Sequence, residues 1–211
     1  KSLREAALTA EPAGFPRAIA RMRAVVEAES KVVAHQLTRN GVRFFRGSAT
    51  FLSPKEILVM GTRKKTSLHG ENFVIATGAS PILHAEFMLP GAPIFDSDTV
   101  LQRKALPKKL LVVGAGVIGC EYASIFARLG SRVTLVDRRA ELLRAVDPEA
   151  IEALKEEFVE AGIHLRLNAK LGPPKKIAAG AVGIKVNGRA WRGDCVLVCL
   201  GRQANTGGLG L

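Results

Sequence analysis

The stretch "LLVVGAGVIGCEY" at 110–122 contains most of the residues with a recognisable functional pattern. Its glycines fit the pattern G-x-G-x-x-G, and they follow a run of aliphatic residues typical of a strand. Gly114 permits a tight turn, Gly116 lets the backbone approach a pyrophosphate, and Gly119 allows a helix to pack closely on the strand. The pattern therefore predicts a turn that binds a dinucleotide.

The predicted phosphate cradle comprises Gly114, Ala115, Gly116, Val117, Ile118 and Gly119. A helix that starts here would offer free N–H groups and the positive end of its dipole to the phosphates. A glycine-rich turn without a ligand is the alternative interpretation.

Nucleotide preference depends on the residues at the end of the next predicted strand. Asp137 ends "RVTLVD" and could accept hydrogen bonds from the ribose hydroxyls, which favours NAD. Arg138 and Arg139 follow at once, and guanidinium groups suit a 2′-phosphate, which favours NADP. We therefore expect both nucleotides to bind, with solvated arginines as the alternative.

Glu121 and the cysteines are the other residues that could take part in a reaction or bind a ligand. Glu121 is expected in the first turn of the helix, where a carboxylate would favour the helix dipole. Cys120, Cys195 and Cys199 are sparse and odd in number, which predicts buried structural thiols in a reducing compartment and favours a cytoplasmic location. No spacing typical of metal ligands occurs.

Strands and helices are predicted to alternate around these residues. Strands are predicted at "KLLVVGAG", "RVTLVD" and "IHLRLN", with helices at 117–129 and from the N-cap Asp147 to Gly162 between them. Strand–helix–strand order requires parallel pairing with right-handed crossovers. A β-rich stretch follows, with Asn187-Gly188 as its hairpin turn.

The first half of the chain has a different pattern. A helix is predicted over 17–39, followed by extended pieces at "VRFFRGSATFLS", "EILVMG" and "ENFVIATG" that indicate a small β-meander. Residues 79–107 contain four prolines and no helical period, which indicates a connector between domains.

Composition narrows the function classes. The 211 residues are 47% hydrophobic and carry a net charge of +12, with basic residues scattered in short pairs. One Trp and one Tyr leave few stacking platforms for bases, so nucleic-acid binding is not favoured. No apolar run is long enough to span a bilayer, and the first residues lack the apolar segment of a signal peptide.

Three motifs in order, "IATGASP" (75–81), "GAGVIGCEYASIFARLGSRVTLVD" (114–137) and "LGRQANT" (200–206), resemble the flavin-dependent pyridine nucleotide–disulfide oxidoreductase family. That family includes dihydrolipoamide dehydrogenase and glutathione reductase. "IFDSDTVL" (94–101) and "GCEYASIF" (119–126) resemble its transhydrogenase branch most closely. The resemblance covers nearly the whole chain.

The resemblance implies roles for particular residues. The loop from Gly114 to Glu121 corresponds to the nicotinamide-nucleotide loop, and Asp137 to the ribose-reading position. Glu121 corresponds to a catalytic glutamate beside flavin and nicotinamide that pairs with a lysine. The remaining implied cofactor contacts are Leu171 on the adenine side, Gly201 near the nicotinamide, and Thr50, Ala76, Thr77 and Gly78 toward the flavin.

The resemblance also implies an α/β fold: a Rossmann-like NAD(P)-binding domain, with a parallel sheet and a three-stranded β-meander, inserted in a partial FAD-binding domain. We expect the partial FAD-binding domain and connector at 1–106, the NAD(P)-binding domain at 107–200, and the start of the return to the FAD domain at 201–211. The family's N-terminal FAD motif, its redox helix with the lysine and its C-terminal dimerisation domain are not found here.

The implied activity is hydride transfer between NADPH and NAD through FAD by a flavoprotein. This stretch would be mainly the NAD(P)-binding part and inactive by itself, with an incomplete FAD site. The implied enzyme is a homodimer or higher homo-oligomer without a membrane segment. Dihydrolipoamide dehydrogenase or a related disulfide reductase, and a non-enzymatic nucleotide-binding module, are the alternatives.

Overall fold

The computed structural model of the chain describes residues 14–177 and 180–211. The chain divides into two compact units. Unit 1 holds Pro81–Gly201 together with the described residues up to Val25, and unit 2 holds Val26–Ser80 and Arg202–Leu211. Helix α2, Gly14–Arg39, contributes to both units. The first 13 residues of the predicted FAD-binding part lie outside the described residues.

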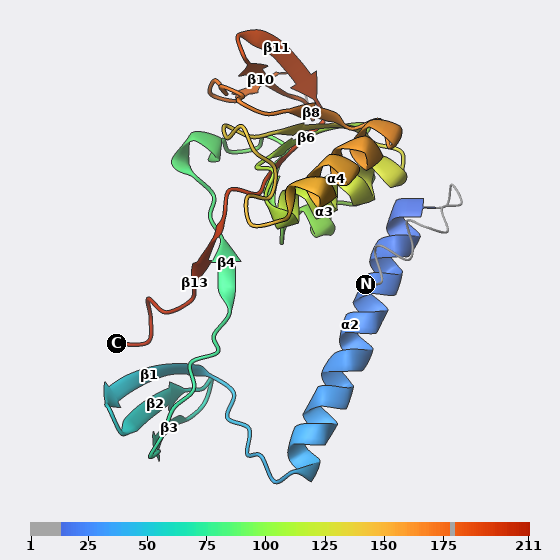
Figure 1. Cartoon of the computed structure of the whole chain (residues 1–211). Coiled ribbons are helices and arrows are strands. Elements are labelled where there is room, and N and C mark those ends of the chain that lie inside the picture. The colour runs from blue at the N-terminus through green and yellow to red at the C-terminus, as the bar shows by residue number, and fades with distance from the viewer. Residues whose placement is uncertain (1–13, 178–179) are drawn as a thin grey trace. The chain divides into compact units, whose positions relative to one another are not determined.

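Unit 1 is built on a five-stranded parallel sheet in the order β5-β12-β6-β7-β8. Strands β6 and β8 of this sheet are labelled in Figure 1. The strands are β5 Ile94–Asp96, β6 Lys109–Val113, β7 Arg132–Val136, β8 His164–Arg166 and β12 Cys195–Val198. Helices α3 Val117–Arg128 and α4 Pro148–Glu160 connect β6 to β7 and β7 to β8. The predicted α/β alternation is therefore confirmed.

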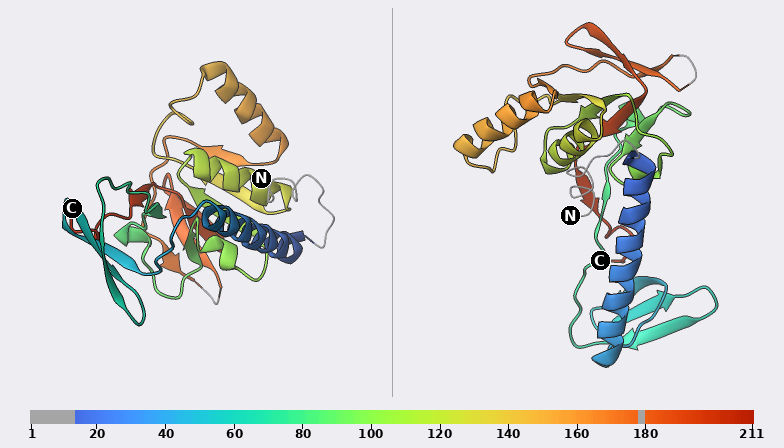
Figure 2. Two further views of the ribbon diagram at one scale, coloured as in Figure 1. Left: turned by 90° about the horizontal axis from the view of Figure 1, so that it is seen from below. Right: turned by 90° about the vertical axis from the view of Figure 1, so that its right-hand side faces the viewer.

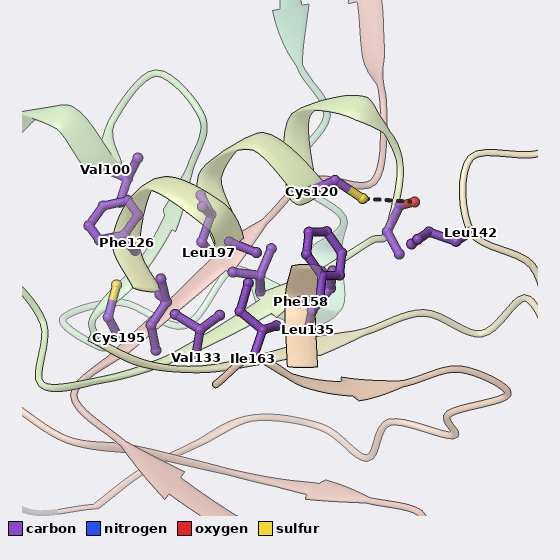
Figure 3. Packing of buried hydrophobic residues seen from close by; sticks show 14 of the residues in the cluster. Val100, Cys120, Phe126, Val133, Leu135, Leu142, Phe158, Ile163, Cys195 and Leu197 are labelled. Atoms are coloured by element: carbon purple, nitrogen blue, oxygen red, sulfur yellow. Dashed lines mark hydrogen bonds between the residues drawn. The ribbon is translucent and has the colours of Figure 1, made fainter. Parts of the chain in front are cut away.

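Both faces of this sheet are buried, as the period of two along β6 shows. Leu110 and Val112 belong to the hydrophobic cluster on the helical side, whereas Leu111 and Val113 belong to the cluster on the other side. Figure 3 shows the helical side, where Phe126 of α3 and Phe158 of α4 pack with side chains of the sheet.

A three-stranded antiparallel β-meander covers the other face of the sheet (Figure 2, right-hand view). Its strands are β9 Lys175–Lys176, β10 Val182–Val186 and β11 Arg189–Gly193. Asn187 and Gly188 form the two-residue turn, and both have positive φ, as a type I′ hairpin turn requires. The predicted hairpin turn is confirmed.

Unit 2 contains a second antiparallel sheet, β1-β2-β3, formed by β1 Ser48–Ser53, β2 Glu56–Met60 and β3 Lys65–His69. A two-stranded sheet pairs β4 Ala79–Pro81 with β13 Arg202–Ala204. The third predicted strand, at 71–78, is not formed; the strand lies instead at Lys65–His69, where a regular ladder with β2 is available.

The segment predicted as a connector, 79–107, has regular structure of its own. Besides β4 it contains the 3₁₀ helices η1 Ala85–Phe87 and η2 Val100–Gln102. It also supplies β5, which pairs in parallel with β12 at the edge of the main sheet. Residues 81–106 therefore group with the parallel sheet, and the assignment of 1–106 to an FAD-binding domain stays a prediction.

Among the residues that the structure describes, no helix is both long and apolar enough to cross a membrane.

Candidate functional site

The glycine turn lies at the carboxyl end of β6, beside the carboxyl end of β12. The chain leaves β6 toward β7 on one side, while β12 flanks β6 on the other, so this is a topological switch point of the sheet. Ligands of open parallel sheets bind outside the carboxyl ends of strands at such points. The fold therefore places the predicted cradle where a ligand is expected.

The glycines of the turn differ in what a side chain at each position would meet. Gly114 has φ of 105°, and a Cβ there would overlap the backbone carbonyl of Cys199. A Cβ on Gly119 would overlap the carbonyl oxygen of Gly114, so the helix can approach the turn closely only without a side chain. At Gly116 a Cβ would meet nothing within 4 Å, which leaves the backbone open on that side.

The N-terminus of α3 has unpaired donors next to this opening. Gly116 is the N-cap and has no side chain to cap the helix. The first intrahelical bond runs from the Cys120 N–H to the Gly116 carbonyl, at 3.0 Å. The N–H groups of Val117, Ile118 and Gly119 precede that bond and, with the helix dipole, could hold a phosphate or pyrophosphate.

Asp137 lies directly after β7, and its carboxylate is hydrogen-bonded by Ala115 and Arg139. Its carboxylate accepts hydrogen bonds from the Ala115 N–H at 2.7 Å and from the Arg139 N–H at 2.8 Å. The Arg139 guanidinium donates two more, from Nε at 3.1 Å and from Nη2 at 2.8 Å. Only 5% of the Asp137 side chain is exposed. The carboxylate therefore ties the glycine turn to the residues that follow β7.

The charge of Asp137 is maintained by these contacts. Burial by itself would raise the pKa of the carboxyl, but the hydrogen bonds from Arg139 and Ala115 outweigh burial and hold the pKa below its ordinary value. Asp137 and Arg139, which were predicted to contact the ribose hydroxyls and the 2′-phosphate, thus form an ion pair with each other. Arg138 is exposed and makes no hydrogen bond or ion pair with any residue in the described part of the chain.

Glu121 lies in the second turn of α3, because the helix begins at Val117; its prediction in the first turn is wrong. Its side chain is exposed and has no hydrogen bond or ion pair with the described residues. The side chain is therefore available to a group outside those residues. The neighbouring Tyr122 is held differently, since its hydroxyl donates to the Ser97 carbonyl at 2.7 Å.

The three cysteines are free thiols of unit 1: Cys120 and Cys195 are buried in its core, and Cys199 is half-buried and packs against that core. Burial raises the pKa of Cys120, Cys195 and Cys199 to about 12 each. The Cys120 Sγ contacts the Ala115 carbonyl oxygen at 3.6 Å (Figure 3). A thiol with so high a pKa is a poor nucleophile and metal ligand at neutral pH, so these cysteines are structural. No group of His, Cys, Asp and Glu within the described residues could hold a metal ion.

The remaining predicted residues of unit 1 lie on two separate segments. Leu171 is half-buried, forms a β-bridge with Val186 and packs against the core beneath the meander. Gly201 has φ of 130°, and its carbonyl accepts a hydrogen bond from the Ile82 N–H at 3.0 Å. The structure does not test their cofactor contacts.

The predicted flavin-side residues all lie in unit 2. The Thr50 hydroxyl donates to the Gly208 carbonyl at 3.0 Å. Ala76, Thr77 and Gly78 lie in an irregular segment before β4, and Gly78 has φ of 72°. Their contact with a flavin stays a prediction.

Asn205 is a structural residue of unit 2 that the sequence did not single out. Its side-chain amide donates to the Thr77 carbonyl at 3.2 Å, and its N–H donates to the Gly78 carbonyl at 3.0 Å. The Ser80 hydroxyl donates to its side-chain oxygen at 2.8 Å. The motifs "IATGASP" and "LGRQANT" therefore meet at Asn205, and its place in the second motif was the signal that could have identified it.

The parallel sheet, the glycine turn and the helix behind it are typical of nucleotide-binding α/β proteins. A family profile described as "Pyridine nucleotide-disulphide oxidoreductase" matches residues 1–210. The chain belongs to that family, as its motifs predicted.

Curated relatives and solved structures agree with this membership. Soluble pyridine nucleotide transhydrogenase of Mycobacterium tuberculosis is 37% identical over 92% of this chain, and that of Hahella chejuensis is 36% identical over 93%. The chain spans 42% and 43% of their lengths. The structure of the HOCl-induced flavoprotein disulfide reductase RclA from Escherichia coli superposes with a TM-score of 0.86 at 28% identity, over 99% of this chain and 47% of that one.

Proposed function

We propose that the chain supplies the nicotinamide-nucleotide-binding part of an FAD-dependent enzyme that transfers hydride between NADPH and NAD. The observation that carries the proposal is the glycine turn, where Gly116 leaves open space beside the unpaired N–H groups that begin α3. The transhydrogenase relatives share 36–37% identity over most of the chain, which supports hydride transfer between the two nicotinamide nucleotides as the proposed reaction.

The roles of the chain's residues follow from their positions. The turn and the start of α3 bind the pyrophosphate and thereby fix the nucleotide along the edge of the sheet. Asp137 holds the turn through Ala115, so the cradle is formed before the ligand arrives. Bound FAD would supply the two-electron chemistry, which the chain's own side chains cannot perform.

Glu121 acts as a positioning residue in this proposal. Its exposed and unpaired carboxylate would accept a hydrogen bond from a cationic group near the reacting rings, as the family resemblance implies. Thr50 and Ala76–Gly78 would contribute backbone contacts to the flavin, and Leu171 and Gly201 would line the nucleotide.

Titration of the chain with NADH and NADPH, followed by nicotinamide fluorescence, tests the binding role. Gly116→Val should abolish binding without unfolding the chain, because its Cβ meets no protein atom but enters the space proposed for the pyrophosphate. Gly207→Val is the matched control, since a Cβ there also meets nothing within 4 Å. Equal affinity of the Gly116→Val variant and the parent chain would overturn the proposal.

Arg138 is the residue we propose to recognise the 2′-phosphate of NADP. Its guanidinium is exposed and unpaired within the described residues, whereas that of Arg139 is engaged by Asp137. Arg138→Ala combined with Arg139→Ala should weaken NADPH binding more than NADH binding, and Arg138→Ala alone should produce most of the difference. Equal losses for both nucleotides would show that neither arginine recognises the phosphate.

A disulfide reductase is the second candidate, because the superposed RclA structure is described as a flavoprotein disulfide reductase. The two candidates differ in the final electron acceptor. The FAD-loaded whole protein should reduce an NAD analogue with NADPH if it is a transhydrogenase, and a disulfide substrate if it is a reductase. Activity only with the disulfide would replace the first proposal by the second.

We also propose a cytoplasmic homodimer or higher homo-oligomer. The three free thiols support a reducing compartment. Sedimentation of the whole protein tests the assembly, and a monomer at micromolar concentration would contradict it.

A further inference from the structure

A cavity of about 670 Å³ lies in unit 1 between the parallel sheet and the β10–β11 hairpin. Its walls come from the start of β6, from β7 and β8, and from both strands of the hairpin. Its lining residues include Lys109, His164, Arg166, Arg189 and Trp191. It shares none of these residues with the glycine turn or with the residues after β7, so it is separate from the proposed nucleotide site.

The cavity is basic. Lys109, Arg166 and Arg189 have basic side chains, and none of the described residues that line the cavity is acidic. None of these three side chains forms an ion pair with the described part of the chain. Like charges gathered around one hollow without counterions favour binding of an anion.

Trp191 supplies an independent observation. Its Nε1–H is buried and has no hydrogen-bond acceptor among the described residues. An indole N–H can only donate, and a buried donor without an acceptor is uncommon in folded proteins. Lys109 Nζ lies 5.5 Å from the centroid of the same ring, so one of the cations lies over the indole of a residue that lines the cavity.

The geometry points to a second binding site, for a small organic polyanion with a phosphate group or several carboxylates. Arginine forks bind such groups through paired charge-assisted hydrogen bonds, and Lys109 adds a point charge. The volume is in the range of small-molecule pockets, about 300–1,000 Å³. The ligand would bridge β8 and the hairpin, with Arg166 on one wall and Arg189 on the other.

The sequence offers a local probe, because Trp191 is the only tryptophan of the chain. Titration of the 211-residue chain with pyrophosphate and with citrate at constant ionic strength should change tryptophan emission saturably. Acetate, with one charge, should change it little. The two polyanions distinguish a preference for phosphate from a preference for carboxylates.

Arg189→Gln and Arg166→Gln should each weaken the response at least about tenfold, since each removes a charged donor. Arg192→Gln is the matched control: it removes the same charge from the same strand, at a residue that does not line the cavity. The inference would be overturned if neither polyanion changed the tryptophan emission. It would also be overturned if Arg189→Gln and Arg192→Gln lost the same affinity for the polyanions.

Discussion

Substitutions at Gly119 and Gly116 are expected to affect different properties, stability at Gly119 and ligand binding at Gly116. Gly119→Ala places a Cβ on the carbonyl oxygen of Gly114 and should lower the free energy of unfolding by about 1–3 kcal/mol, as overpacking does. Gly116→Ala should leave that free energy nearly unchanged, because its Cβ meets nothing within 4 Å. Urea unfolding of the two variants measures the difference. If the two variants lost similar free energy of unfolding, a Cβ at Gly116 would have to contact protein atoms after all.

Asp137 gives a pH dependence whose sign follows from its contacts. The folded pKa lies below the ordinary value of 3.8, so the stabilisation by the carboxylate is complete above that value and is lost as the pH falls through the folded pKa. Asp137→Asn should therefore destabilise the chain at pH 7, and the gap to the parent should close in acid. Urea titrations across that pH range measure it. A gap that is constant with pH would assign the loss to packing alone.

The pairing of Asp137 with Arg139 was beyond the reach of sequence patterns. The sequence places the carboxylate of Asp137 and the guanidinium groups of Arg138 and Arg139 directly after a strand. The pattern predicts that all three contact the ribose or its 2′-phosphate. Which group a carboxylate contacts depends on the folded path of the chain, here the approach of Ala115 to the end of β7. The partners of a polar side chain are therefore learned only from the structure.

At the element scale, the elements with strong local signals were predicted. Helix α4 begins after Asp147, as its cap and Pro148 indicated, and the Asn187-Gly188 turn joins β10 to β11. Strand β5 was missed because its three residues carry no periodic pattern. It exists through pairing with β12, a hundred residues away in the chain, and such pairing leaves no local signal.

The N-cap of α4 provides a test at this scale. The Asp147 side chain accepts a hydrogen bond from the Glu149 N–H at 2.9 Å. Asp147→Ala leaves that donor unpaired and should lower the free energy of unfolding by about 1 kcal/mol. Asp147→Ser keeps an acceptor and serves as control. Equal losses in both variants, measured by urea unfolding, would show that the cap is not the cause.

At the scale of the whole molecule, the two units have different cores. The parallel sheet of unit 1 is buried on both faces, with Phe126 and Phe158 on one side and Val182 and Ile184 on the other. In unit 2, Val59 and Leu209 are the only residues of the described chain outside unit 1 whose hydrophobic side chains are buried. Unit 1 therefore has the apolar burial that a stable folded unit needs, and we expect its unfolding to be cooperative.

The cysteines make that unfolding measurable. Cys120 lies on α3 and Cys195 on β12, both in the core of unit 1, and burial raises the pKa of each thiol to about 12. Since only the thiolate reacts, a disulfide reagent at neutral pH should label neither cysteine while unit 1 is folded, and both after it unfolds. The labelling rates should rise with urea in parallel with the loss of helical circular dichroism. A thiol that reacts in the native chain at a rate independent of urea would show that it is reached by a local opening and not by unfolding of the sheet.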